Sequence, residues 1–339
     1  MIVRRQLGAI AVFAALLVAL PACGSSSSSE GGDNAVTLYS GRIGPIINPA
    51  IKQYEDASGV DVRTRFGDSP SLAATLIEEG DNSPADMFFA QDAGSLDAVE
   101  KQDLLLELPA DILEMVPEQY RSATGRWVGV TGRSRIIAYG EKVRASELPD
   151  SPLDLTDEKW EGRVGWAPTN ASLQGYITAL RLVEGEEVAK QWLEGMVAND
   201  VQVYDSNVPV RDAIAKGEID LGLINHYYVA EAAAEDRDYP VKAHFPPDDL
   251  GSLINVAGVG VLASTGDDRE LALDFVRQML SRETQTYFAD SSKEYPLASG
   301  VKAPPELVPL ADIPAPRVDL AKLGDLQGTL KLMRDTGAL

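Results

Sequence analysis

Two adjacent phenols, Tyr227 and Tyr228, follow the apolar run "IDLGLIN" at residues 219–225 and precede the helix-like segment "VAEAAAED". The run has the length and composition of a buried strand. Neighbouring residues in a regular strand point to opposite faces, so both phenols reach one ligand only where the backbone leaves strand geometry, as at a strand-to-helix junction. The alternative is packing, with one ring in the core and the other at the surface.

A second strand-to-helix junction lies in "GWAPTNASLQGY", where Pro168, Thr169 and Asn170 lead into a helix. The first turn of a helix offers free backbone N–H groups, which hold anions together with nearby hydroxyl donors. Ordinary N-capping by Thr169 or Asn170 is the alternative, and the two roles do not exclude each other. This second junction favours a ligand site.

Strand and helix patterns alternate along the chain and must position these junctions. They predict strands at 35–40, 60–66, 85–90, 132–140, 163–169, 201–204, 219–225 and 254–263, and helices at 44–59, 69–80, 172–185, 208–218 and 268–290, the last as one long amphipathic helix. This alternation indicates an α/β fold, in which ligands bind beyond the carboxyl ends of the strands. The length of 339 residues predicts two lobes, and the apolar fraction of 45% indicates a folded chain.

The N-terminus resembles a lipoprotein signal peptide. Arg4 and Arg5 precede a short apolar run, and "LPAC" places Cys23, the only cysteine, where a bacterial lipobox has its acylated residue. A cleaved secretory signal with an incidental thiol is the alternative. We predict a signal peptide at 1–22 and a flexible leash at 23–34, with the protein lipid-anchored to the cell membrane outside the cytoplasm, at the cell surface or in the periplasm.

The acidic surface excludes one class of partner. Without residues 1–22 the chain has 28 basic and 52 acidic residues, a formal net charge of -24. Such a surface repels nucleic acid, and we predict no nucleic-acid partner.

Six segments carry a resemblance to a known family: "LYSGR", "EEGDNSPADMFFAQDAGSLDAVEKQDLL", "GRSRIIAYG", "KWEGRVGWAPTNAS", "AIAKGEIDLGLINHYYV" and "KEYPLASGV". The chain resembles the ferric-ion-binding proteins of bacterial ABC importers. The resemblance implies the two-lobed type II periplasmic-binding-protein fold, with two crossover segments and the ligand in the interlobe cleft. We expect residues 35–131 and 257–305 to form the N-terminal lobe and residues 132–256 and 306–339 the C-terminal lobe.

In that family consecutive tyrosines bind Fe3+, a role that falls here on Tyr227 and Tyr228. The chemistry is consistent, since a hard cation prefers anionic oxygen and drives the proton from a phenol. Family members often complete the shell with a synergistic anion, which could be carbonate, phosphate or citrate-like. The residues that match the anion site are Gln91, Asn170, Ala171, Ser172, Asn207 and Asn225. Candidates to balance the anion's charge are Arg42, Arg133 and Arg135, with structural ion pairing as their alternative role.

The sequence departs from the family at the other metal ligands. Ile43 and Ala90 stand where some members have a His and a Glu, and Ala171 stands where another branch has a third tyrosine. Anion oxygens or water must therefore fill the remaining positions of an octahedral shell. We expect Asp92 to be a solvated aspartate that caps a helix rather than a metal ligand, and His226 to be a residue that supports the tyrosines or faces outward rather than a ligand.

The remaining tyrosines and the other histidine are expected to be structural; they are Tyr39, Tyr139, Tyr176, Tyr204 and His244. The chain has no G-x-S-x-G elbow, Walker motif or dinucleotide fingerprint, so we predict no enzyme activity. The combined prediction is a monomeric solute-binding lipoprotein that captures Fe3+ as cargo and delivers it to an ABC permease with its ATPase. The alternatives are a protein of the same fold that binds an iron chelate, an oxyanion or a small organic ligand, and a non-transport role such as a sensor or an enzyme domain.

Overall fold

Ten strands form one mixed sheet in the computed structural model, which describes residues 34–339 without the side chain of residue 321. The spatial order is β2-β1-β3-β9-β4-β7-β5-β6, and β8 and β10 also pair with β4. The strands are β1 (Ala35–Ser40), β2 (Asp61–Phe66), β3 (Met87–Ala90), β4 (Trp127–Gly140), β5 (Val164–Trp166), β6 (Gln202–Val203), β7 (Leu221–Asn225), β8 (Val241–His244), β9 (Ile254–Val261) and β10 (Tyr295–Pro296). The predicted signal peptide, Cys23 and the predicted leash up to residue 33 lie outside the described residues.

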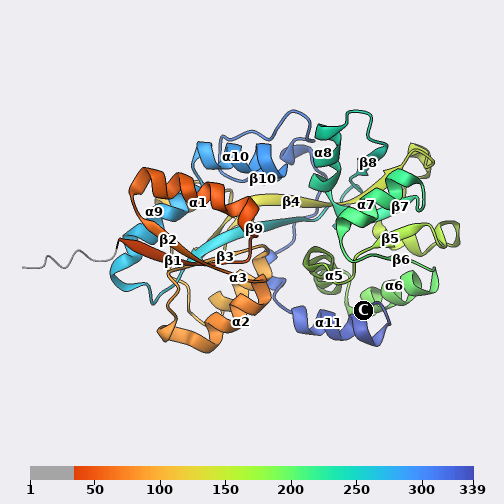
Figure 1. The fold of residues 1–339 in the computed structure, drawn as a ribbon. Coiled ribbons are helices and arrows are strands. Elements are labelled where there is room, and N and C mark those ends of the chain that lie inside the picture. The colour runs from red at the N-terminus through yellow and green to blue at the C-terminus, as the bar shows by residue number, and fades with distance from the viewer. Residues whose placement is uncertain (1–33) are drawn as a thin grey trace, which may run out of the picture. The chain divides into compact units, whose positions relative to one another are not determined.

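The long strand β4 joins two parts of this sheet. Up to Ser134 it pairs antiparallel with β9, and β10 pairs with it at Thr131 and Gly132. From Arg135 onward it pairs antiparallel with β7 and then with β8. We call β1, β2, β3, β9, β10 and residues 127–134 the first half-sheet, and β5 to β8 with residues 135–140 the second. Figure 1 shows β4 and β9 running through the centre of the molecule, between the two groups of strands.

Parallel pairing brings strand ends together at one edge of each half-sheet. β1 is parallel to β2 and β3, and β5 is parallel to β6 and β7. The helices that connect these strands and cover the sheet are α1 (Gly44–Ser58), α2 (Ser69–Glu79), α3 (Ala93–Glu100), α4 (Ala110–Leu113), α5 (Ala171–Val183), α6 (Glu186–Ala198), α7 (Asn207–Lys216), α8 (His226–Glu235), α9 (Arg269–Met279), α10 (Arg282–Ser292) and α11 (Leu326–Asp335). The predicted α/β fold is confirmed.

The single long helix predicted at 268–290 is wrong. The chain forms α9 and α10 instead, and the break falls at Leu280 and Ser281. Ser281 adopts an extended backbone conformation, and its Oγ accepts a hydrogen bond at 3.2 Å from the N–H of Thr284. Serine competes for backbone donors in this way and starts a new helix, although the apolar periodicity continues across the break.

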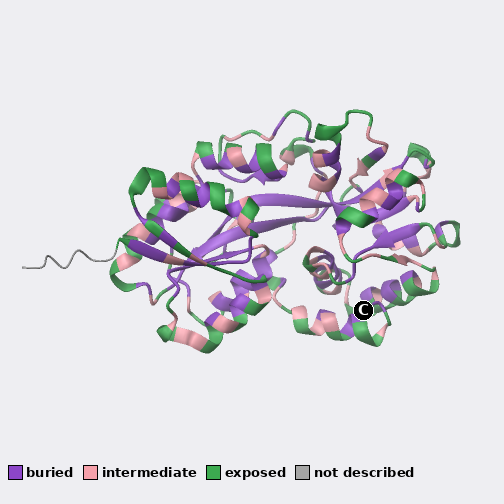
Figure 2. Cartoon of the chain, in the orientation of Figure 1, coloured by how far each residue is buried: buried purple, intermediate pink, exposed green. Residues whose placement is uncertain are grey.

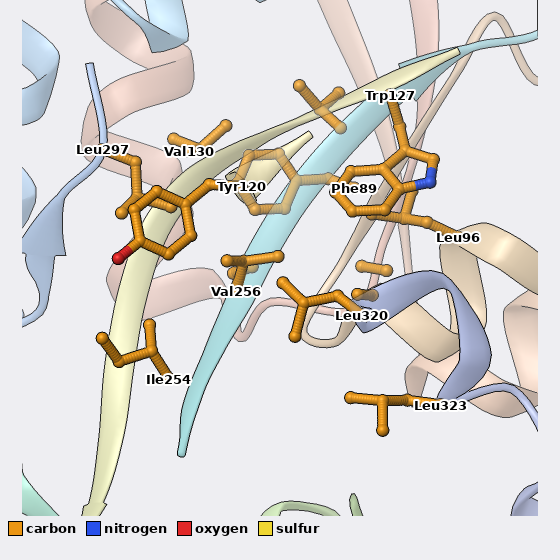
Figure 3. Close-up of a cluster of buried hydrophobic side chains, with 14 of the residues drawn as sticks. Phe89, Leu96, Tyr120, Trp127, Val130, Ile254, Val256, Leu297, Leu320 and Leu323 are labelled. Carbon is orange, nitrogen blue, oxygen red and sulfur yellow. The ribbon is translucent and has the colours of Figure 1, made fainter. Parts of the chain in front are cut away.

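The apolar core lies under the crossing strands. Figure 2 shows buried residues concentrated on the strands and exposed residues on the outer faces of the helices. Figure 3 shows Leu320 of the C-terminal segment among the clustered apolar side chains that include Phe89 and Val256, with Leu323 of the same segment further out at the edge of the cluster. That segment then continues into α11, where Thr329 and Thr178 of α5 share a hydrogen bond of 2.7 Å between their hydroxyls. The C-terminal residues therefore contact both half-sheets' helices.

No helix between residues 34 and 339 is both long enough and apolar enough to cross a bilayer.

Candidate ligand-binding site

The two adjacent tyrosines lie in the first turn of α8, directly after β7. β7 ends at Asn225 and α8 begins at His226, as the strand-to-helix prediction requires. The rings of Tyr227 and Tyr228 lie side by side, with centroids 4.3 Å apart and planes inclined by 39°. Both rings are half-buried, rather than one in the core and one at the surface. The junction therefore presents two phenols together.

The phenol of Tyr227 is protonated in this environment. Burial is the largest cause that raises its pKa, and the neighbouring Tyr228 raises it further. Asn225 donates a long hydrogen bond of 3.5 Å from Nδ2 to the Tyr227 hydroxyl. A cation that binds the phenolate must therefore displace a firmly held proton, so binding releases a proton and weakens at low pH.

His226 directs neither ring nitrogen toward the tyrosine hydroxyls. Its Nδ1 accepts a hydrogen bond of 3.1 Å from the backbone N–H of Ser134. Its Nε2 lies 2.9 Å from the carbonyl oxygen of Lys293 and donates to it, because a carbonyl can only accept. The ring is almost fully buried, and burial lowers the pKa of His226 to about 4. The imidazole is neutral and fully bonded, so His226 does not face outward.

A chain of hydrogen bonds joins the tyrosine junction to the predicted anion loop. Arg135 donates from Nη1 to Asn225 Oδ1 at 3.2 Å, and Asn225 donates from Nδ2 to Ser172 Oγ at 3.0 Å. Asn170 caps α5, and its Oδ1 accepts from the N–H of Ser172 at 3.0 Å. Ala171, the first residue of α5, is exposed. The structure thus brings Asn170, Ser172 and Asn225 together beside the phenols.

Three buried side chains keep polar atoms without a hydrogen-bond partner within the described residues. Within residues 34–339 no hydrogen-bond partner is present for Nε and Nη2 of Arg135, Nη1 of Arg133, or either side-chain polar atom of Asn207. All three side chains are buried, and Asn207 is 0% exposed. Burial lowers the pKa of Arg135 to about 10, while Tyr176, Tyr227 and Tyr228 act to raise it. An unpaired buried polar group costs roughly 1–3 kcal/mol, which an anionic ligand with suitable acceptors would recover.

The first half-sheet contributes different groups. Gln91 donates from Nε2 to the carbonyl of Gly41 at 2.5 Å, and the main-chain carbonyl of Gln91 accepts from Nη2 of Arg133. Ala90 is buried at the end of β3, whereas Ile43 is 57% exposed at the start of α1. Neither of these two residues carries a metal-binding group.

Asp92 caps α3, as predicted. Its carboxylate accepts hydrogen bonds from the N–H of Ser95 at 2.8 Å and from the Ser95 hydroxyl at 3.0 Å. Burial raises the pKa of this carboxyl group, against the effect of these hydrogen bonds. Its hydrogen bonds are therefore committed to the helix terminus.

Arg42 forms a structural ion pair. Its Nη1 and Nη2 donate to the two carboxylate oxygens of Glu294 at 3.0 and 2.7 Å, and both side chains are buried. Thr131 donates to the same carboxylate at 2.9 Å. Of the two roles considered for Arg42, these contacts support internal pairing; Arg133 and Arg135 keep N–H groups free for an anion.

Two cavities lie away from the phenols. One of about 200 Å³ lies between α2 and α3 on one side and α5 and α11 on the other, and it reaches Asp92, Ala171 and Asn255. A larger one of about 1050 Å³ is lined mostly by apolar residues of 117–123 and 296–320. Tyr227 and Tyr228 line neither of them. The smaller cavity shares Ala171 with the predicted anion loop but none of the other residues proposed for the site.

Ordinary metal-binding clusters are absent from the described part of the chain. No group of three or more His, Cys, Asp or Glu side chains there could hold a metal ion. A cation at this site would therefore depend on phenol oxygens and on a ligand from outside the protein. Hard trivalent cations suit such an all-oxygen environment.

The fold and the site together define a protein that holds a small ligand, and the sequence identifies the class. The chain belongs to the family of bacterial extracellular solute-binding proteins, whose model matches residues 36–291. Its members are transport proteins that bind solutes, and the family is not an enzyme family.

Individual relatives of known cargo are also similar to this chain. The chain is 31% identical to the Fe(3+)-binding periplasmic protein of Serratia marcescens, over 98% of both chains. It is 34% identical to iron-bound HitA from Pseudomonas aeruginosa, with a TM-score of 0.82 over 89% of this chain and 99% of that one. A Trichodesmium protein (IdiA, FutA) in complex with iron and citrate ligands is 28% identical, with a TM-score of 0.77 over 89% and 99% of the two chains. The resemblance to ferric-ion-binding proteins and the predicted periplasmic-binding-protein fold are confirmed.

Sequence reasoning missed Glu294, which completes the buried pair with Arg42. The segment "KEYPLASGV" carried part of the family resemblance, but nothing in the local pattern marks its glutamate as buried. The partners are 252 positions apart in the chain. The pairing of β10 with β4 and the packing of α1 against α10 bring the two segments together.

Proposed function

We propose that this protein captures Fe3+ together with a synergistic anion outside the cytoplasmic membrane and delivers it to an ABC importer. The observation that carries the proposal is the side-by-side pair of Tyr227 and Tyr228, hydrogen-bonded through Asn225 to Arg135 and the anion loop. The similarity to iron-binding relatives supports the same cargo.

The phenolates of Tyr227 and Tyr228 are the protein's iron ligands in this proposal. Ile43 and Ala90 offer no ligand on the other side, so the anion supplies most of the remaining oxygens of an octahedral shell. Iron held by two phenolates beside Arg133 and Arg135 keeps a net positive charge. A polycarboxylate neutralises that charge more fully than carbonate and offers more oxygens, so we favour a citrate-like anion over carbonate or phosphate.

The anion's contacts follow from the unpartnered groups. Arg135 and Arg133 offer N–H donors, and the side chain of Asn207 offers both a donor and an acceptor. The remaining proposed anion contacts are Asn170, Ala171, Ser172 and Asn225, with Gln91 approaching from the first half-sheet.

The proposed lobes are residues 35–131 with 257–305, and residues 132–256 with 306–339. The change of partners along β4 between Ser134 and Arg135 supports two lobes joined by crossing strands. Closure of the lobes around the cargo would give the permease a shape to recognise. The proposed lipid anchor at Cys23 would keep the monomer near that permease, and we propose no catalytic activity.

A second candidate is a protein of this fold that takes up a preformed iron chelate. The exposed side chain of Ile43 favours it, because an apolar side chain stands where some relatives have a metal ligand. In that case the organic part of the chelate contacts the surface around Ile43. The phenols then supply only some of the iron's ligands.

Iron retention after desalting tests the proposal. The mature protein (residues 23–339) is loaded with Fe3+ in the presence of citrate, phosphate or carbonate, and bound iron is measured by atomic absorption. We expect one iron per chain with citrate and less with carbonate. Arg135→Met should lose most of the citrate-dependent retention, whereas Arg144→Met, which removes an exposed arginine, should retain iron normally. Absence of retained iron with every anion would contradict the proposal.

A further inference from the structure

His226 connects the start of the tyrosine-bearing helix to the first half-sheet. We propose that His226 is a positioning residue that fixes the orientation of Tyr227 through this connection. The inference rests on the proposed function in so far as Tyr227 binds iron. His226 touches no ligand in it and acts only through its neighbour.

Four residues contact the His226 ring. Ser134 donates its backbone N–H to Nδ1, and Nε2 donates to the carbonyl of Lys293. The ring of Tyr295 stacks on the imidazole, with centroids 4.5 Å apart and planes inclined by 18°. The ring of Tyr227 meets the imidazole edge-to-face, with centroids 5.9 Å apart and planes at 85°. These contacts fix the position of the imidazole, and the ring of Tyr227 packs against it.

Two of these partners, Ser134 and Tyr295, belong to the first half-sheet, and Lys293 lies between α10 and β10 of that half-sheet, whereas His226 follows a strand of the second. Ser134 is the last residue of β4 that pairs with β9 before the strand changes partners. Tyr295 belongs to β10, which pairs with β4 at Gly132. His226 therefore bridges the two half-sheets where β4 passes from one to the other.

The backbone of Lys293 is arranged to accept this bond. Lys293 ends α10 in the left-handed conformation, with φ of 52°, which is uncommon for a residue other than glycine. The turn directs its carbonyl to His226, and the next residue, Glu294, pairs with Arg42. Uncommon backbone conformations persist where surrounding contacts hold them, and they cluster at functional sites. The hydrogen bond from His226 Nε2 to Lys293 therefore ends on a segment that other contacts also hold in place.

No side chain within the described residues caps the start of α8, so its position depends on the hydrogen bonds of His226. Asn225 stands at the N-cap position, but its amide is engaged with Arg135 and Ser172. The cap residue serves the anion site, so the first helical turn depends on His226 for its fixed position. Residues that orient a metal ligand typically change metal affinity by about 10- to 100-fold when they are replaced.

Replacement of the imidazole gives a direct test in the mature protein loaded with ferric citrate. His226→Leu removes both hydrogen bonds, and His226→Gln keeps a donor for Lys293. Tyr295→Phe is the matched control, because it keeps the stacked ring and removes a hydroxyl that has no hydrogen-bond partner among residues 34–339. We expect His226→Leu to shift the tyrosinate-to-iron absorption band and to speed iron loss to a competing chelator by about 10- to 100-fold. His226→Gln should show a smaller effect, and Tyr295→Phe should match the wild type.

A measurement without metal separates this inference from the proposed function. The aromatic carbon NMR signal of Tyr227 reports the ring's surroundings in the metal-free protein. It should move in His226→Leu and stay in place in Tyr295→Phe. If the wild type retains no iron, the proposed function fails and the NMR signal still decides the inference. If both His226 variants lower the thermal midpoint but leave the band, the release rate and the NMR signal unchanged, His226 is only structural and the inference is overturned. If His226→Leu does not fold, His226→Gln decides.

Discussion

The buried ion pair between Arg42 and Glu294 should respond strongly to loss of one partner. Arg42→Met removes the two charge-assisted hydrogen bonds of 2.7 and 3.0 Å that hold the carboxylate. Hydrogen bonds to charged groups contribute roughly 1.5–3 kcal/mol each, and breaking one side of a buried pair costs about 3–5 kcal/mol. We therefore expect the free energy of unfolding at pH 7 to fall by about 3–5 kcal/mol.

The pH dependence of this loss has a definite sign. Burial alone would raise the pKa of Glu294, but Arg42, Arg133 and the hydrogen bonds outweigh it and lower the pKa. In the wild type the stabilisation from Glu294 is present above its unfolded pKa and is lost as pH falls through its lowered folded pKa. Without Arg42 we expect burial to dominate and to raise the pKa, so the variant gains relative stability as pH falls. The difference between the two proteins should therefore shrink from pH 7 toward pH 4.

Urea unfolding at several pH values, followed by circular dichroism, measures this effect. Lys52→Met, which breaks an exposed pair with Asp56, is the control and should leave the midpoint nearly unchanged. Arg42→Met combined with Glu294→Gln should cost less than the two single changes added together, because no charge is then left buried alone. A loss below about 1 kcal/mol for Arg42→Met, or a loss independent of pH, would refute the reasoning.

Three further changes test other parts of the structure. Asn207→Leu removes two buried polar atoms that have no hydrogen-bond partner among residues 34–339, so it should raise the free energy of unfolding of the metal-free protein by about 1–3 kcal/mol. The same change removes a proposed anion contact and should reduce iron retention with citrate; retention equal to that of the wild type would contradict an anion role for Asn207. Ser281→Ala should lower the free energy of unfolding by about 1 kcal/mol in urea titrations through loss of the α10 cap, and a neutral result would argue against that cap. Gly222→Ala brings a methyl group to 2.5 Å from Cγ1 of Val210, so thermal unfolding should show a cost of about 1–3 kcal/mol, and an unchanged midpoint would contradict the close packing of β7 on α7.

Local sequence patterns predicted the elements that carry the site. The strand at 35–40 was predicted with its exact bounds, and the tyrosine junction lies where strand and helix patterns meet. These features depend on residues close together in the chain, whose periodicity is visible in the sequence. The break between α9 and α10 was missed because the polar cap of Ser281 interrupts a continuing apolar pattern.

The contacts that fix the site could not be predicted in this way. The ion pair of Arg42 joins residues 252 positions apart, and the hydrogen bonds of His226 join residues 67 and 92 positions apart. Such contacts depend on which strands pair, and strand pairing is set by the whole sheet rather than by local periodicity. The unpartnered N–H groups of Arg135 became evident only when every neighbour of its side chain was in place.

The central claim is that Tyr227 and Tyr228 together bind ferric iron. Its most direct test is the visible absorption spectrum of the mature protein after addition of ferric citrate and desalting. We compare the wild type with the double variant Tyr227→Phe, Tyr228→Phe, and with Tyr204→Phe, which removes a phenol that packs near Gly165, as the control. We predict a phenolate-to-iron charge-transfer band in the wild type and in Tyr204→Phe that is absent from the double variant. A colourless wild type, or a band that persists in the double variant, would contradict the claim.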